Sequence, residues 1–333
     1  MGFLNDRQRQ EFEENKPKAL QADIWMISGC EDKQTSADVS NVAAFQLPDP
    51  QGRAGGACTA CLLNVLYEDE QTPFEEFSFV QVMTKMRTFL KQKGFSQIPQ
   101  LSSTQPIDMN TKFNLVPETL PGTRRAVLIG INYVGQNGQL SGCHNDVFNM
   151  YNYIQDYYGF QDEDVTVLVD DGDHQSPTKA NILAAYRKVV SQSQAGDAIF
   201  LHYSGHGTKV RDVSGDEDDG YDEALCPLDF QSAGIILDDD LNDMIVKALP
   251  PGVHVVALYD CCHSGTVLDL PYIYKADGKY SRMEIEDTFN FNKLFAMFGK
   301  GKMGQAMAKG AQQLLSTGMG GKMAKGMLKQ FKF

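Results

Sequence analysis

The sequence lacks the cysteine framework, the long apolar runs and the positive charge that several large classes of protein require. Its seven cysteines are an odd number without paired spacing, and no apolar signal run opens the chain, so we expect a reducing, cytoplasmic setting. No stretch is long and apolar enough to cross a membrane. The formal net charge of -13 argues against nucleic acid as a partner and favours cations, either metal ions or basic substrates.

The apolar residues are numerous and ordered enough to predict an α/β fold. With 42% hydrophobic residues, a chain of 333 residues can bury one large or two ordinary cores. Apolar runs alternate with helical patterns, which predicts a mostly parallel sheet with helices between the strands. Strands are expected at residues 23–28, 125–132, 165–169, 198–203 and 254–260. Helices are expected at residues 58–67, 79–93, 145–158, 178–191 and 240–249.

A histidine and a cysteine follow two of these expected strands. His206 comes after the strand at residues 198–203, and Cys262 comes after the strand at residues 254–260. The carboxyl ends of parallel strands open onto one crevice, so the two side chains are expected to meet there. An imidazole can take the proton of a thiol and return it to a leaving amine, which indicates Cys262 as nucleophile and His206 as its partner. The backbone N–H groups of Gly207 and Cys262 would then form an oxyanion hole.

Other interpretations of these residues stay open. Taken alone, Cys262 is more typical of a buried thiol and His206 of a loop histidine, and only the pair at two strand ends favours catalysis. A zinc site of Cys261, Cys262, His263 and His206 is disfavoured, because adjacent cysteines lack the spacing of a ligand hairpin. Cys261 is interpreted as a small buried residue. The alternative is a redox role, in which Cys261 or Cys143 forms a disulfide that protects Cys262 from overoxidation.

Four segments together resemble a known family, at residues 203–207, 215–222, 236–239 and 260–265. Their order and spacing resemble the metacaspases, the caspase-like cysteine peptidases of plants, fungi and protists, with residues 122–275 as the large catalytic subunit. Residues 21–106 resemble the small subunit of the same family. Because the small subunit comes first here, the chain resembles the permuted type III metacaspases of algae. The resemblance implies a caspase-like (caspase-hemoglobinase) α/β fold, with a mostly parallel central sheet flanked by helices on both faces.

The remaining segments are an N-terminal extension at residues 1–20, a linker at residues 107–121 and a C-terminal tail at residues 276–333. From residue 290 onward the tail contains no acidic residue and is rich in Lys, Met, Gly and Phe. Such a segment suits a flexible tail, an amphipathic helix on an acidic membrane surface, or a basic strip on the acidic body of the same protein. We favour a regulatory tail that covers the active-site face, and its lysines are candidate sites of self-cleavage.

Acidic residues cluster in a glycine-punctuated loop after His206 and again near residue 238. The usual interpretation of such a run is a solvated loop, and the sharper one is a site for a hard cation. No register fits an EF-hand, because the Gly at its sixth position and the Glu at its twelfth are absent. The metacaspase resemblance implies a Ca²⁺ site made of four aspartates, which are Asp222, Asp238, Asp239 and Asp269.

Charge also predicts the substrate. Asp260 stands two residues before the predicted nucleophile, and a buried carboxylate there would select Arg or Lys before the scissile bond. The resemblance adds Asp146 as a second carboxylate, with Cys143 and Ser204 lining the pocket. Asp146 also suits a helix cap. We therefore expect a calcium-dependent, monomeric endopeptidase that cleaves proteins or peptides after Arg or Lys, and keep a catalytically silent, calcium-binding scaffold as the alternative.

Overall fold

A computed structural model describes most of the chain. The described residues are 21–29, 38–39, 55–67, 77–117, 119–211, 221–261, 267–280 and 282–285. All of these except Arg211, Tyr221 and Asp222 belong to one compact unit, made of Gln21–Val210 and Glu223–Glu286. The predicted N-terminal extension and the tail from residue 286 lie outside the described residues.

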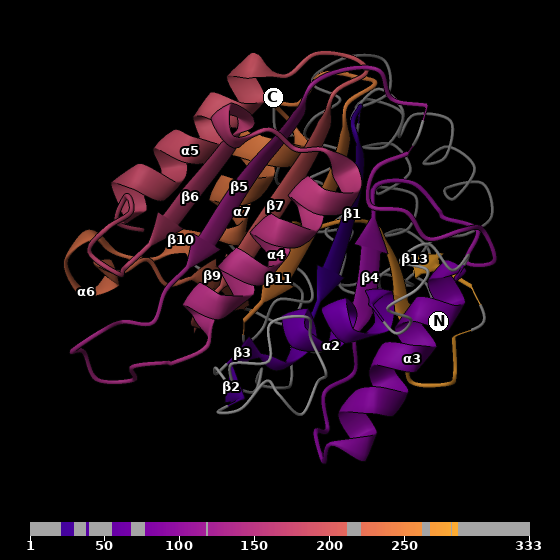
Figure 1. Cartoon of the computed structure of the whole chain (residues 1–333), viewed down its shortest axis with the longest axis horizontal. Coiled ribbons are helices and arrows are strands. Elements are labelled where there is room, and N and C mark those ends of the chain that lie inside the picture. Colours follow the sequence, from indigo (N-terminus) through magenta and orange to yellow (C-terminus); the bar gives the residue numbers. More distant parts are fainter. Residues whose placement is uncertain are drawn as a thin grey trace, which may run out of the picture. The chain divides into compact units, whose positions relative to one another are not determined.

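The core of this unit is an eight-stranded sheet with the order β13-β12-β4-β1-β11-β7-β5-β6 (Figure 1). Its strands are β1 (Asp23–Ser28), β4 (Gln100–Ser103), β5 (Arg124–Gly130), β6 (Val165–Val169), β7 (Ala198–Ser204), β11 (His254–Asp260), β12 (Tyr272–Lys275) and β13 (Glu284–Ile285). Neighbours from β1 to β6 in this order pair in parallel, whereas β4, β12 and β13 add antiparallel pairs at one edge. The prediction of a mostly parallel sheet is confirmed.

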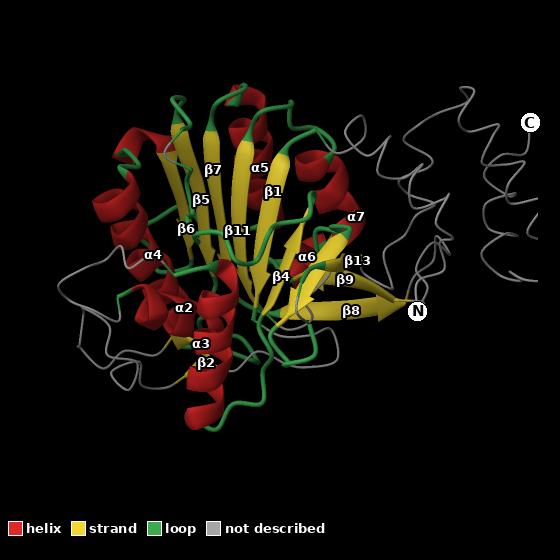
Figure 2. Ribbon diagram, turned by 90° about the vertical axis from the view of Figure 1, so that its right-hand side faces the viewer, coloured by secondary structure: helices red, strands yellow, loops and turns green. Residues whose placement is uncertain are grey.

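The helices lie on both faces of the sheet, as predicted (Figures 1 and 2). One face carries α2 (Ala57–Leu66), α3 (Phe79–Gln92) and α4 (Cys143–Tyr158), and the other carries α5 (Lys179–Gln192) and α7 (Asp238–Leu241). With both faces covered, every residue of β7 and β11 is buried. Among the described residues, no helix has the length and apolar run needed to cross a bilayer.

Local signals explain where several helices begin and end. Ser78 and Gln81 form a capping box at the start of α3, in which each side chain accepts a backbone N–H of the other residue. Gly159 ends α4 in the left-handed conformation. The predicted helix at residues 240–249 is present with other bounds: α7 begins earlier, at Asp238, and continues as a π-helical turn, η3 (Asn242–Val246).

Shorter elements surround the main sheet. The strands β8 (Gly207–Arg211), β9 (Tyr221–Leu225) and β10 (Ile236–Leu237) form a second sheet with the order β10-β9-β8. A two-stranded sheet pairs β2 (Asp38–Val39) with β3 (Gly55–Gly56). The remaining short helices are η2 (Asp162–Asp164) and α6 (Phe230–Ala233).

The register of the parallel strands brings the predicted site together. Ser204, the last residue of β7, pairs with Asp260 at the end of β11 and with Gly130 at the end of β5. The carboxyl ends of these three strands therefore lie side by side. Open α/β sheets bind their ligands at these strand ends.

A buried aspartate joins two of these strands at their opposite, amino-terminal ends. Asp197 is fully buried, and its carboxylate accepts the backbone N–H of Thr123 at 2.8 Å and that of Gln194 at 3.0 Å. It also accepts a guanidinium N–H of Arg125 at 2.6 Å. One carboxylate thus joins the starts of β5 and β7, and it compensates the charge of Arg125.

We expect Asp197→Ala to lower the free energy of unfolding by about 3–5 kcal/mol, because it leaves a largely buried guanidinium and two N–H groups without their acceptor. The matched control is Asp243→Ala, which breaks the surface pair with Lys247 and should cost less than about 1 kcal/mol. Urea denaturation of the two variants measures both values. Equal, small losses in the two variants would contradict the anchoring role of Asp197.

Candidate active site

The predicted catalytic histidine, His206, lies directly after β7 and is held on several sides. Its backbone N–H donates to the hydroxyl of Tyr133 at 3.0 Å, and its carbonyl accepts from the hydroxyl of Tyr203 at 2.9 Å. The imidazole packs on the ring of Tyr133 at a centroid distance of 4.7 Å. Its Nε2 lies 2.6 Å from the carbonyl oxygen of Gly138. A carbonyl only accepts, so Nε2 carries the hydrogen in this contact, and Nδ1 of the neutral ring is the acceptor.

The predicted nucleophile, Cys262, lies outside the described residues, as does His263. The chain is described up to Cys261, which is buried. Since Ser204 pairs with Asp260, His206 and Cys262 each stand two residues beyond the same paired position. The described parts of the two segments, up to His206 and Cys261, therefore leave the sheet from neighbouring strand ends. Gly207 is the first residue of β8.

Two buried carboxylates lie close together at the carboxyl ends of β7 and β11. Asp146 in the first turn of α4 is 1% exposed, and Asp260 at the end of β11 is 4% exposed. The hydroxyl of Ser204 donates to Asp146 Oδ2 at 2.6 Å. A Cβ atom built on Gly56 would lie 2.3 Å from Asp260 Oδ2 and 2.8 Å from Asp146 Oδ2, so both carboxylates border a single point.

The structure thus gathers Asp146, Ser204 and Asp260, three of the four residues predicted to line the pocket. The fourth, Cys143, is buried and begins α4, one turn before Asp146. The interpretation of Asp146 as a helix cap is wrong, because α4 begins three residues earlier and its N-cap is Gly142. The Asp146 carboxylate points instead toward Ser204 and Gly56.

Several contacts at this edge were not predicted from the sequence. The backbone N–H of Gly56 donates to both carboxylate oxygens of Asp146, at 2.9 and 2.7 Å. The backbone N–H of Thr59 donates to Asp260 Oδ2 at 2.7 Å. These donors belong to the start of α2, in the small-subunit-like region. The sequence of this region predicted no role for its consecutive glycines, Gly55 and Gly56.

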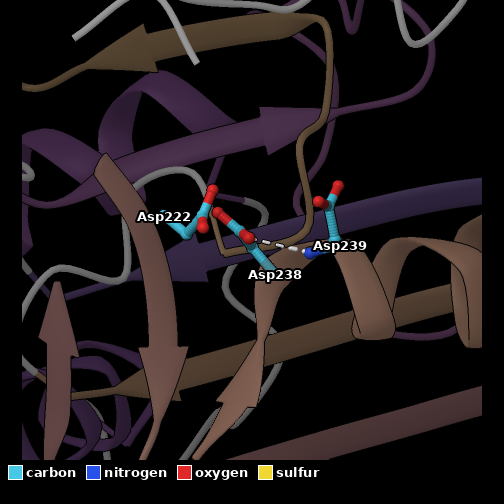
Figure 3. A group of neighbouring side chains, drawn as sticks. All are labelled: Asp222, Asp238 and Asp239. Atoms are coloured by element: carbon cyan, nitrogen blue, oxygen red, sulfur yellow. Dashed lines mark hydrogen bonds between the residues drawn. The ribbon is translucent and has the colours of Figure 1, made fainter. Parts of the chain in front are cut away.

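Three aspartates form a second acidic group (Figure 3). Each of Asp222, Asp238 and Asp239 offers one carboxylate oxygen, and these oxygens all lie within 4.8 Å of one another. Asp238 accepts the backbone N–H groups of Glu223 at 2.9 Å and of Asp239 at 2.8 Å. Ca²⁺ binds oxygen at 2.3–2.6 Å, so opposite ligands stand roughly 5 Å apart, and the spacing of the three aspartates fits this ion.

Asp269, the fourth aspartate implied by the resemblance, is described but is not a member of this group. Its backbone is left-handed, with φ of 49°. Its place as a ligand stays a prediction. The acidic run at residues 212–220 lies outside the described residues.

A second histidine, His202, lies in the same strand as the site but is fully buried. Its Nε2 is 3.3 Å from the hydroxyl oxygen of Thr59. Burial lowers the pKa of His202 from 6.5 to about 3, because the charged imidazolium would be desolvated there. The ring is therefore neutral in the folded protein at neutral pH.

Comparison with known proteins agrees with the fold and with the order of the two regions. Residues 124–271 match the model of the metacaspase, peptidase C14 domain, and residues 3–110 match the model of the caspase domain. A caspase-like cysteine peptidase is the class that these matches define. Metacaspase III c from Phaeodactylum tricornutum is 62% identical over 301 residues, which cover 90% of this chain and 89% of that protein. The chain belongs to the metacaspase family.

Fungal relatives match a smaller part of the chain. Metacaspase-1A from Neurospora crassa is 45% identical over 204 residues, which cover 60% of this chain and 45% of the relative. Metacaspase-1A from Aspergillus niger is 51% identical over 168 residues, which cover 50% of this chain and 42% of the relative. The chain spans less than half the length of these two relatives. The predicted order, with the small-subunit region first, is confirmed by the positions of the two family matches.

We expect the stability of the protein to fall as the pH drops below about 6.5, the pKa of an unperturbed His202. Below that pH the unfolded chain binds a proton that the buried ring cannot accept. The free energy of unfolding therefore falls by up to about 1.4 kcal/mol per pH unit. His202→Gln should therefore show a shallower loss of unfolding free energy between pH 6.5 and pH 5. Identical slopes in the variant and in the unaltered protein would contradict this role of His202.

Proposed function

We propose that this metacaspase is a calcium-dependent cysteine endopeptidase that cleaves proteins after Arg or Lys, with Cys262 as nucleophile and His206 as its base. The observation that carries the proposal is the pair of buried carboxylates, Asp146 and Asp260, at the edge of the sheet where the histidine strand ends. Self-processing, a monomeric state and a cytoplasmic location belong to the same proposal and rest on the sequence alone.

The contacts of His206 support its role as a base. With Nε2–H donating to Gly138, the ring has one orientation and one tautomer, and Nδ1 remains to accept the proton of the Cys262 thiol. The thiolate then attacks the carbonyl carbon of the scissile bond, and the imidazolium gives its proton to the leaving amine. Water activated by the same ring hydrolyses the thioester and regenerates the thiol. The N–H groups of Gly207 and Cys262 would stabilise the oxyanion in both steps.

The preference for basic substrates follows from the charge of the pocket. A guanidinium or ammonium group can be shared between the Asp146 and Asp260 carboxylates, and Arg forms bidentate contacts with such groups. An acidic side chain at the same place would be repelled by two buried negative charges. The pocket therefore favours Arg or Lys and rejects Asp, in contrast to an acid-specific peptidase.

The residues that would hold Ca²⁺ are Asp222, Asp238 and Asp239, with Asp269 as the fourth candidate. Hard carboxylate oxygens at this spacing suit the ion. When bound, it would offset the mutual repulsion of the three carboxylates and so order the segments that carry them. Asp238 follows β10 directly and Asp222 lies in β9, which pairs with β10. The ion would therefore act on the small sheet that also contains β8, the strand directly after His206.

The first test is hydrolysis of a fluorogenic peptide ending in Arg, with and without millimolar Ca²⁺. We expect calcium-dependent turnover that falls by roughly 10⁴-fold or more in Cys262→Ala, because the nucleophile is lost. Cys261→Ala is the matched control and should keep its activity. Full activity in Cys262→Ala would exclude this residue as the nucleophile. Calcium binding without turnover of Arg, Lys or Asp peptides would instead support the silent scaffold.

The second test concerns the cation. Asp239→Asn removes one negative ligand, so we expect the Ca²⁺ concentration for half-maximal activity to rise at least about tenfold. The matched control is Asp240→Asn, which changes the neighbouring, exposed acid of the same helix and should have no such effect. Calorimetric titration with Ca²⁺ follows binding independently of activity. Unchanged calcium binding in Asp239→Asn would contradict the site.

A further inference from the structure

We infer that Gly56 is a specificity-determining residue of the basic-substrate pocket, although it lies in the small-subunit-like region and has no side chain. Its backbone N–H positions the Asp146 carboxylate, and its missing Cβ allows both pocket carboxylates to approach the start of α2. The inference rests on the proposed preference for Arg or Lys, and its experiment separates the two.

The start of α2 supplies the hydrogen bonds that orient both carboxylates. Gly56, the N-cap residue, donates its N–H to Asp146, and Thr59 in the first turn donates its N–H to Asp260. The first N–H groups of a helix have no partner within the helix, and they carry the positive end of its dipole. These backbone N–H groups therefore stabilise two carboxylates better than neutral side-chain donors would.

This arrangement offsets the cost of burying two like charges. Asp146 and Asp260 are almost fully buried, so water screens their mutual repulsion only weakly. Hydrogen bonds to ionised acceptors are stronger than those between neutral groups. With these bonds in place, both carboxylates keep a fixed orientation before any substrate arrives, which is the condition for a selective pocket. The region that precedes the catalytic one thus acts on specificity through its backbone.

Position 56 requires glycine because of a close approach and not because of its backbone angles. Gly56 has φ of -69° and ψ of 141°, which any residue can adopt. A Cβ there would lie 2.3 Å from Asp260 Oδ2, 2.7 Å from Asp260 Cγ and 2.8 Å from Asp146 Oδ2. All three distances are shorter than the 3.0 Å that real Cβ atoms keep. Alanine at this position must therefore displace the carboxylates themselves.

The chain offers a matched control for this clash. A Cβ on Gly122 would lie 2.4 Å from Asp197 Oδ1 and 2.5 Å from the carbonyl oxygen of Gly196. Gly122→Ala thus forces the same atom against a carboxylate, but at the opposite ends of the strands. Any general loss of stability from such a clash should appear in both variants, whereas a loss of substrate selection should appear only in Gly56→Ala.

The experiment measures kcat and KM for a peptide ending in Arg. We expect Gly56→Ala to raise KM at least about tenfold with a smaller change in kcat, because the displaced carboxylates lose ground-state contacts with the basic side chain. Gly122→Ala should lower the melting temperature and leave KM unchanged. Equal KM values in the two variants would overturn the inference. If Asp260→Ala also leaves KM unchanged, the preference for Arg or Lys fails instead.

A double mutant tests the same contact through stability as well as through KM. In Asp260→Ala the two nearest atoms that the new Cβ would meet are gone, and only Asp146 Oδ2 at 2.8 Å remains closer than 3.0 Å. Adding Gly56→Ala should therefore raise KM by a smaller factor in Asp260→Ala than in the unaltered protein. The double mutant should also melt at a higher temperature than Gly56→Ala alone. If Gly56→Ala by itself does not fold, a double mutant that does fold is the expected result. Additive losses of melting temperature in the double mutant would overturn the inference.

Discussion

The parallel pairing of β7 with β11 is the constraint on which the rest of the site depends. Seven residue pairs join the two strands, from His254 with Ala198 to Asp260 with Ser204, and all of these residues are buried. A shift of one residue would turn every side chain of one strand to the other face of the sheet. Burial on both faces excludes such a shift. The same register therefore fixes the core and also sets Asp260 beside the strand that leads to His206.

The position of β1 explains how the two regions can stand in reversed order along the chain. It pairs in parallel with β11 over six residues, so residues 21–106 extend the sheet of the catalytic region directly. Strand pairing and burial depend on neighbours in space, and closing a longer surface connection costs little additional free energy. Circular reordering therefore preserves the sheet. The contact between α2 and the two pocket carboxylates also joins the two regions through hydrogen bonds.

The parts of the fold that the sequence predicts are those whose signal is local. The strands β1, β6 and β11 have the predicted bounds, because each is an apolar run between clear turns. The strand β4 was not predicted: its buried residues include Gln100, Ser102 and Ser103, and only pairing with β1 and β12 explains their burial. At the site, the sequence predicted the pocket residues Asp146, Ser204 and Asp260, which the structure brings together. It did not predict that the backbone of Gly56 donates a hydrogen bond. A backbone N–H has no signature in a sequence.

Each of the two acidic groups at the described site includes an aspartate in the first turn of a helix. Asp146 is in the first turn of α4 and faces the start of α2, and Asp238 is the first residue of α7. Free N–H groups gather at such places, so the fold itself offsets part of the cost of burying negative charge. Hydrogen bonds from the backbone stabilise a carboxylate without neutralising it. The buried charge therefore remains available to a cation, and an acidic protein can select basic side chains in one place and bind a hard metal ion in another.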